Sequence, residues 1–131
     1  MTYRLTIIEK PGYLHATATG EHTAANARRF LTEAHEACMK RGHDAVLLEV
    51  NFSGPSLPAH SIFDVISSQS AAAQRLRRIA YVETGQERDP EQMKFAETVA
   101  RNRGVNVRLF RDLAGAEAWL LAREDGAGRS R

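Results

Sequence analysis

The sequence has a single cysteine, few aromatic residues and no long apolar run. Cys38 is the only cysteine among 131 residues, which excludes an intramolecular disulfide and a cysteine-rich zinc site. No run of about 18 apolar residues occurs, so we expect no membrane-spanning helix. The first residues also lack the apolar stretch of a signal peptide. These absences predict a protein of the reducing cytoplasm.

An excess of charge of one sign is also missing. Lysine and arginine number 18 against 16 aspartate and glutamate residues, and the net charge is +2. Acidic and basic residues alternate along most of the chain, which argues against a nucleic-acid partner. The 43% hydrophobic content is typical of a globular protein, and the length fits one domain. We therefore expect a single domain over residues 1–124 and a flexible C-terminal tail over 125–131.

The N-terminal residues predict a β-hairpin. Residues 3–8 and 13–18 both alternate between apolar and polar side chains, and Pro11-Gly12 between them is typical of a turn. Apolar periodicities, capping residues and glycines then predict alternating helices and strands. The expected elements are a helix over 23–41, a strand over 45–50, a loop from Asn51 to Pro58, a helix after it to about Leu76, a strand over 79–82, a helix capped by Asp89, a strand over 105–110 and a helix opened by Asp112.

Strand–helix alternation of this kind predicts a mainly parallel sheet with right-handed crossovers. Several strands alternate, however, whereas strands covered on both faces are apolar throughout. Leu14 and Leu48 fall on one predicted face, and His15 and Glu49 fall on the other. We therefore predict a two-layer α/β fold with a five-stranded, mainly parallel sheet, an N-terminal hairpin and four helices mostly on one face.

This layout resembles a known family. A hairpin leading into repeated β-α units and ending in an Asp-Leu-x-x-Ala-x-Ala-Trp-Leu helix, here Asp112 to Leu120, is similar to the SpoIIAA-like group, which is related to STAS domains. The resemblance covers about residues 3–123. It implies a cytoplasmic, non-catalytic protein that binds a protein partner or a small molecule. Some members bind lipids or nucleotides in a groove near the start of the second helix.

The family's functional mark is an Asp-Ser-Ser-Gly sequence at that helix, in which a serine is phosphorylated. Ala59, His60 and Ser61 occupy the corresponding place here, and no Asp precedes a Ser-Ser-Gly. The phosphorylation switch is therefore not expected in this chain.

The segment from Asn51 to Ser61 is the first candidate binding site. It follows a central strand, where open α/β sheets place their ligand crevices, and a helix N-terminus next to it favours anions. Its candidate ligand-binding residues are Ser53, Ser56, His60 and Ser61. The alternative is structural: Ser56 or Ser61 caps the helix, and Ser61 with Asp64 resembles a capping pair.

Sequence signatures of catalysis are missing. No Gly-x-Ser-x-Gly elbow, His-Glu-x-x-His motif or glycine-rich dinucleotide fingerprint occurs, so we expect no enzymatic activity, no cofactor and no metal. Cys38 lies on an apolar helix stripe, which favours a buried thiol.

Two binding functions remain open. The first is a regulatory or protein-interaction module that uses the open sheet face for a partner or for homodimerisation, with His15, Glu49, Tyr81 and Arg108 as interface residues. The second is a carrier that holds a small hydrophobic or anionic ligand, or a lipid, in a crevice at the Asn51–Ser61 loop.

Overall fold

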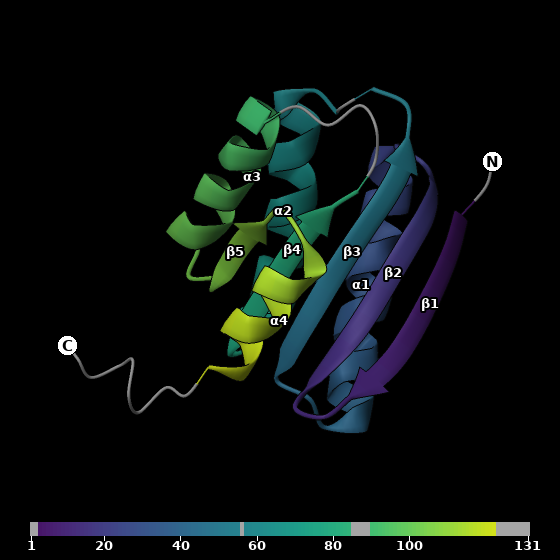
Figure 1. Ribbon diagram of the computed structural model, residues 1–131. Helices are drawn as coiled ribbons and strands as arrows, with labels where there is room; N and C mark the ends of the chain where they lie inside the picture. Colours follow the sequence, from purple (N-terminus) through teal and green to yellow (C-terminus); the bar gives the residue numbers. More distant parts are fainter. Residues whose placement is uncertain (1–2, 56, 85–89, 123–131) are drawn as a thin grey trace.

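The computed structural model describes residues 3–55, 57–84 and 90–122, and Figure 1 shows their arrangement. A five-stranded sheet forms the centre of the molecule, with helices on both sides. The elements in chain order are β1 (Tyr3–Lys10), β2 (Tyr13–Glu21), α1 (Ala24–Arg41), β3 (Ala45–Ser53), α2 (Ala59–Ala73), β4 (Arg78–Glu83), α3 (Pro90–Asn102), β5 (Val107–Phe110) and α4 (Leu113–Leu121). Asp89, the predicted cap of α3, and the predicted tail 125–131 lie outside the described residues.

The sheet confirms the predicted fold class. Its strand order is β1-β2-β3-β4-β5; β1 and β2 are antiparallel, and every later pair is parallel. Each crossover therefore moves one strand further in the same direction. Because crossovers of parallel strands are right-handed, α1, α2 and α3 all lie on the same side of the sheet. We call this side the α1–α3 face (Figure 1).

The fourth helix lies on the opposite side, which we call the α4 face. Only Arg111 and Asp112 separate β5 from α4, and the Asp112 side chain caps the helix by accepting the Gly115 N–H at 2.8 Å. No further strand follows among the described residues, so no right-handed crossover constrains this helix. It folds back over β3, β4 and β5, where its buried residues Ala116 and Leu120 pack (Figure 1).

Side chains of the strands alternate between two cores. Leu14, Val46 and Ile79 occupy neighbouring register positions and belong to the large core of the α1–α3 face. Tyr13, Leu47 and Ala80 belong to the smaller core under α4. The predicted division between the Leu14 face and the His15 face is therefore confirmed.

Glycine conformations fix two chain reversals. Gly42 ends α1 in the left-handed region, and its N–H donates to the Cys38 carbonyl. Gly12 has a φ of 90° in the hairpin turn, and a Cβ there would lie 2.8 Å from Leu121 Cδ2. The turn between β1 and β2 is thus in contact with the end of α4, which ties the N-terminal hairpin to the C-terminal helix.

Two details differ from the predicted loop between β3 and α2. Asn51, predicted to open a loop, is still in β3, because Ser53 remains paired with β2. The N-cap of α2 is Pro58, so Ser61 lies inside the first turn and does not cap the helix. The predicted capping role of Ser61 is therefore wrong.

Cys38 is fully buried, as its position on the apolar stripe of α1 predicted. Burial, together with the nearby negative Asp44, raises the pKa of the thiol to about 11. A thiol with such a pKa is almost entirely protonated near pH 7 and is a poor nucleophile.

Candidate functional site

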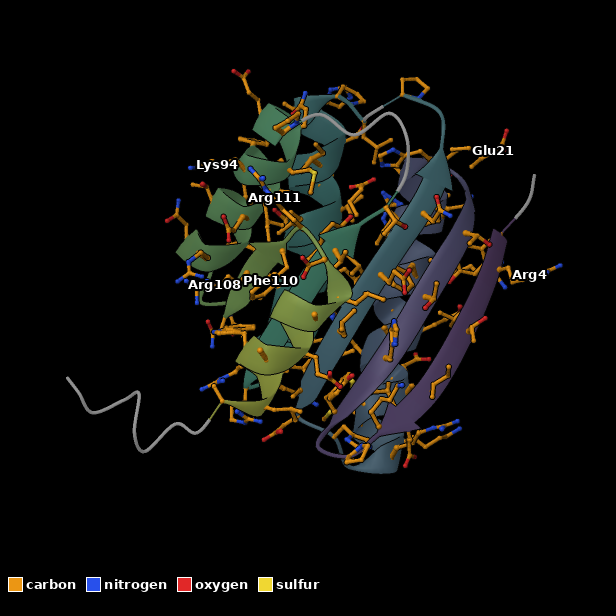
Figure 2. The ribbon with its side chains drawn as sticks, viewed as in Figure 1. Arg4, Glu21, Lys94, Arg108, Phe110 and Arg111 are labelled. Carbon is orange, nitrogen blue, oxygen red and sulfur yellow. The ribbon has the colours of Figure 1, made fainter. Side chains whose placement is uncertain are left out.

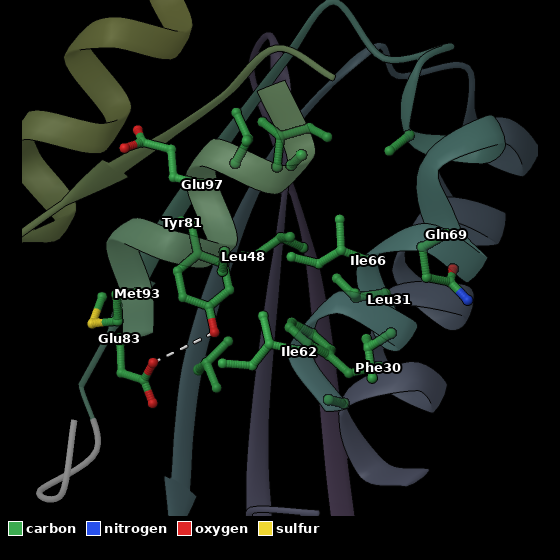
Figure 3. A pocket seen from close by; sticks show the side chains of 18 of the residues that line it. Phe30, Leu31, Leu48, Ile62, Ile66, Gln69, Tyr81, Glu83, Met93 and Glu97 are labelled. Carbon is green, nitrogen blue, oxygen red and sulfur yellow. Dashed lines mark hydrogen bonds between the residues drawn. The ribbon is translucent and has the colours of Figure 1, made fainter. Parts of the chain in front are cut away.

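A hollow lies between the sheet and the three helices of the α1–α3 face. Its volume is about 160 Å³, it is partly open to solvent, and its wall is mainly apolar. Helices α1, α2 and α3 and strands β3, β4 and β5 all contribute to it (Figure 3). An apolar cavity of about 150 Å³ accommodates a molecule of the size of benzene.

The periodicity of each element explains which side chains line the hollow. On β3, Leu48, Val50 and Phe52 are two residues apart and therefore point to the same face. On α2, Ile62 and Ile66 are four residues apart and share one side of the helix. Phe52 of β3 and Ile62 of α2 both line the hollow, so the hollow extends to the end of β3 and to the first turns of α2.

Polar groups are present at a few places in the wall, and the first is at the end of β4. Tyr81 and Glu83 are two residues apart on this strand, and the Tyr81 hydroxyl donates to Glu83 Oε1 at 3.5 Å (Figure 3). The side chain of Glu83 is buried, since the residue retains only 6% of its exposure. Burial, and secondarily the negative charge of Glu83, raises the pKa of Tyr81 strongly, so the hydroxyl remains a donor at neutral pH.

A buried histidine forms a second polar position. His35 of α1 is 5% exposed, and its Nδ1 atom has no hydrogen-bond partner. Burial lowers the pKa of His35, and the side chain of Gln69 on α2 opposes this shift. The imidazole is therefore neutral near pH 7. An unpartnered buried nitrogen is costly in a protein interior, and a bound molecule can supply its missing hydrogen bond.

Two further polar residues of the wall contact neighbouring elements around the hollow. Glu97 Oε2 of α3 accepts the Leu109 N–H of β5 at 3.3 Å, which joins helix and strand. His22 follows β2 and lies against Phe52 with ring centroids 5.6 Å apart. Burial lowers the pKa of His22, and a hydrogen bond to the backbone of Pro55 opposes the change. This histidine, too, is neutral near pH 7.

Three of the four residues predicted for ligand binding lie within the described part of the chain. The Ser53 hydroxyl donates to the Gly20 carbonyl at 3.2 Å, and His60 is exposed to solvent. Ser61 is half-buried in the first turn of α2, and Ser56 lies outside the described residues. None of Ser53, His60 and Ser61 is among the described lining residues, and their binding role remains a prediction.

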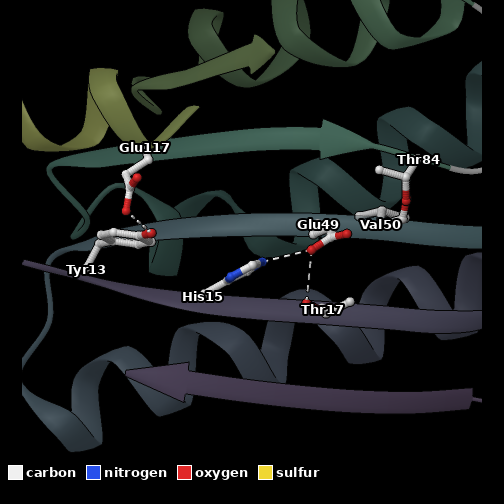
Figure 4. A network of polar contacts seen from close by, with 7 residues as sticks. All are labelled: Tyr13, His15, Thr17, Glu49, Val50, Thr84 and Glu117. Atoms are coloured by element: carbon white, nitrogen blue, oxygen red, sulfur yellow. Dashed lines mark hydrogen bonds and ion pairs between the residues drawn. The ribbon is translucent and has the colours of Figure 1, made fainter. Parts of the chain in front are cut away.

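The predicted interface residues do not share one face. His15 and Glu49 lie side by side on the α4 face, where His15 Nε2 is 2.9 Å from Glu49 Oε1 and Thr17 donates to the same oxygen at 3.3 Å (Figure 4). Tyr81 points to the α1–α3 face, because it pairs with Leu48 rather than with Glu49. Its predicted position on the open face is therefore wrong.

Arg108 is on the α4 face as predicted, near the β5 edge of the sheet and far from β1 (Figure 2). Its guanidinium lies over the Trp119 ring, 5.9 Å from the centroid. The buried Arg78 guanidinium lies 5.4 Å from the same ring and donates to the Trp119 carbonyl. These two contacts fix α4 on the sheet.

Several residues of the hollow were not selected in the sequence as functional. His35 carried a signal, because it lies four residues after Leu31 and hence on the apolar side of its helix, where a polar residue is unusual. Glu83 ends an otherwise apolar strand, but an acidic residue at a strand end is common and does not predict burial. The hollow itself depends on how far the helices stand from the sheet, which no local pattern specifies.

Within the described parts of the chain, no group of three or more histidine, cysteine, aspartate and glutamate residues is arranged to hold a metal ion. In the same residues, no helix is both long and apolar enough to cross a membrane.

No family model matches the chain, and no curated protein matches it in sequence at a significant level. Among solved structures, it is similar to an uncharacterised protein of the DUF3478 family with a SpoIIAA-like fold from Shewanella loihica PV-4. The TM-score is 0.54 at 16% sequence identity, over 90% of this chain and 93% of the other. At this identity the likeness establishes the fold: the chain has a SpoIIAA-like fold, as the sequence resemblance predicted.

Proposed function

We propose that this chain uses its SpoIIAA-like fold as a non-catalytic binding protein for a small, largely apolar molecule held in the hollow of the α1–α3 face. The observation that carries the proposal is the hollow of about 160 Å³ within the main core. Ligand sites are typically concave and apolar, with a few polar groups that orient the ligand. The unpartnered nitrogen of His35 and the Tyr81–Glu83 pair are such groups.

The energetics of packing support this proposal. Because the hollow is partly open, its apolar wall is partly exposed to water, and burial of apolar surface contributes about 25 cal/mol per Å². A ligand that fills the hollow buries this wall and stabilises the folded state.

The composition of the wall supports binding rather than catalysis. The described lining residues include no cysteine and no lysine, and the hydroxyl of their one serine, Ser70, donates to the Ile66 carbonyl at 2.7 Å. A nucleophile next to a base is the usual mark of a covalent site.

The experiment is a comparison of two alanine-to-leucine variants with benzene as the probe. Ala96 lines the hollow on α3, whereas Ala71 is exposed on α2 and serves as the matched control. We expect saturating benzene to raise the melting temperature of the wild type and of Ala71→Leu, and to perturb NMR resonances of the lining residues. Ala96→Leu should lose both responses. Absence of any response in the wild type would refute the proposal.

The open part of the α4 face supports a second function, the docking of a protein partner or of a second copy of the chain. Helix α4 covers β3, β4 and β5 and leaves β1 uncovered (Figure 1). Ile8 is 48% exposed and pairs with His15 in the hairpin. Sedimentation velocity on the wild type and on Ile8→Lys tests self-association; a wild-type monomer at high micromolar concentration would exclude the homodimer.

A further inference from the structure

The polar groups of the hollow differ in whether their hydrogen bonds are already formed. The Ser70 hydroxyl donates to the Ile66 carbonyl at 2.7 Å. Glu97 Oε2 accepts the Leu109 N–H at 3.3 Å. His35 Nδ1 belongs to the same wall, is buried and has no hydrogen-bond partner. A bound molecule can therefore form a hydrogen bond at this nitrogen without breaking one within the protein.

The position of His35 makes such a hydrogen bond favourable. Helices α1 and α2 pack against one another, and His35, Leu31 and Ile66 all line the hollow where these helices meet. Leu31 and Ile66 are part of the wall in Figure 3. Only 5% of His35 is exposed, and in a poorly solvated site an unpaired polar atom is costly and a hydrogen bond to it is strengthened.

The chemistry of the imidazole restricts the group that can pair with it. His35 is neutral near pH 7, because burial lowers its pKa. A neutral imidazole carries one N–H, so Nδ1 is a donor in one tautomer and an acceptor in the other. A hydroxyl group both donates and accepts, and it can therefore pair with either tautomer. A carboxylate only accepts, and its charge would lose hydration against an apolar wall.

We propose that the hollow selects a small apolar molecule with one neutral hydroxyl group, such as a phenol or an alcohol, and that this hydroxyl binds at His35 Nδ1. This inference rests on the proposed function. In a wall without a partner for it, a hydroxyl would lose its hydrogen bonds with water, and the same molecule with a methyl group in its place would bind more tightly. The hydrogen bond at His35 offsets this loss.

Toluene and phenol test the proposal, because they have nearly the same shape and differ by a methyl group in place of a hydroxyl. In NMR titrations of the full chain at pH 7.5, we expect phenol to bind the wild type at least as tightly as toluene. To His35→Leu, toluene should bind about tenfold more tightly than phenol, because the hydroxyl is then buried without a partner. The matched control is His60→Leu, at an exposed position outside the described wall, which should keep the wild-type ratio.

The nitrogen resonances of His35 provide a second readout that needs no variant. A hydrogen bond formed at Nδ1 changes the ¹⁵N chemical shift of this atom. We expect phenol to shift the Nδ1 resonance of the wild type clearly more than toluene does at equal occupancy. A merely structural role of His35 would give the same shift with both probes.

The results distinguish the inference from the function beneath it. A wild type that prefers toluene about tenfold, or a ratio that is the same in the wild type and in His35→Leu, would overturn the selection of a hydroxyl while leaving the binding function intact. Failure of toluene, phenol and benzene to bind would overturn both. If His35→Leu does not fold, the affinity ratio and the Nδ1 resonance of the wild type decide the matter.

Discussion

The two faces of the sheet are packed in opposite ways. The α1–α3 face is covered by three helices and still encloses a hollow of about 160 Å³. The α4 face has one helix of 9 residues, yet Leu120 is only 1% exposed and Ala116 is fully buried. The amount of helix over a sheet therefore does not determine how closely the core is packed, and the looser packing on the α1–α3 face coincides with the polar groups suited to a ligand.

Polar contacts at the helix ends reinforce this contrast. On the α4 face, Tyr13 donates to Glu117 Oε2 at 2.8 Å, and Arg78 binds the Trp119 carbonyl near the end of α4. The α1–α3 face keeps the Nδ1 atom of His35 without a partner. Tyr13 and Arg78 thus hold α4 against one face, whereas the other face has a buried polar atom, His35 Nδ1, without a hydrogen-bond partner.

The largest expected effect comes from truncating matched side chains on the two faces. Leu120→Ala should lower the free energy of unfolding by about 2–5 kcal/mol, because it leaves a cavity in a closely packed core. Ile62→Ala, in the wall of the hollow, should cost less than half as much, because this side chain already has a gap on one side. Urea denaturation monitored by circular dichroism measures both. Equal losses would mean that the two faces are packed alike.

Enlarging an alanine should have effects of opposite sign on the two faces. Ala116→Leu adds volume where none is available and should destabilise the protein by about 1–3 kcal/mol. Ala96→Leu adds methylene groups to the hollow and should stabilise it by about 1 kcal/mol, given about 0.8 kcal/mol per buried methylene. Thermal melts of the two variants test this pair. If both substitutions lowered the melting temperature, the hollow would not have room for a larger side chain.

A smaller effect is expected from pH, and it involves the α1–α3 face. In the folded state the pKa values of His35 and His22 lie below the ordinary histidine value of 6.5, so the unfolded chain binds protons more readily than the folded chain. Their contribution to stability is present above pH 6.5 and is lost as the pH falls through the lowered values. We expect the urea midpoint to be constant near pH 7.5 and to fall at pH 5.5.

The variant His35→Gln isolates the buried histidine in this pH experiment. It should make the decrease between pH 7.5 and 5.5 shallower, because glutamine binds no proton in either state. His60→Gln, at an exposed position, should leave the decrease as it is in the wild type. An unchanged decrease in His35→Gln would show that other groups are responsible.

The sequence predicted the order of elements and the two-face alternation, because both depend on local periodicity, whereas the ligand-binding role of Ser53, Ser56, His60 and Ser61 remains a prediction. Leu48 and Glu49 could be assigned to opposite faces from their positions in one strand. Tyr81 was misplaced because, in a strand that is apolar almost throughout, aromatic and aliphatic neighbours give no indication of which face is inside. The sequence pattern does not specify the position of α4, because no crossover constrains this helix and its placement depends on the contact between Arg78 and Trp119, which are 41 residues apart.

The order β1-β2-β3-β4-β5 also has a consequence for how the chain folds. Every strand pairs with its neighbour along the chain, so each parallel pairing requires only one strand–helix–strand crossover to close. A chain that emerges from the ribosome N-terminus first can add β3, β4 and β5 in the order of their synthesis, each to an edge that already exists. Helix α3 and strand β5 arrive last of the elements around the hollow. The hollow of the α1–α3 face is therefore completed only late in folding, and its apolar wall is exposed until that step.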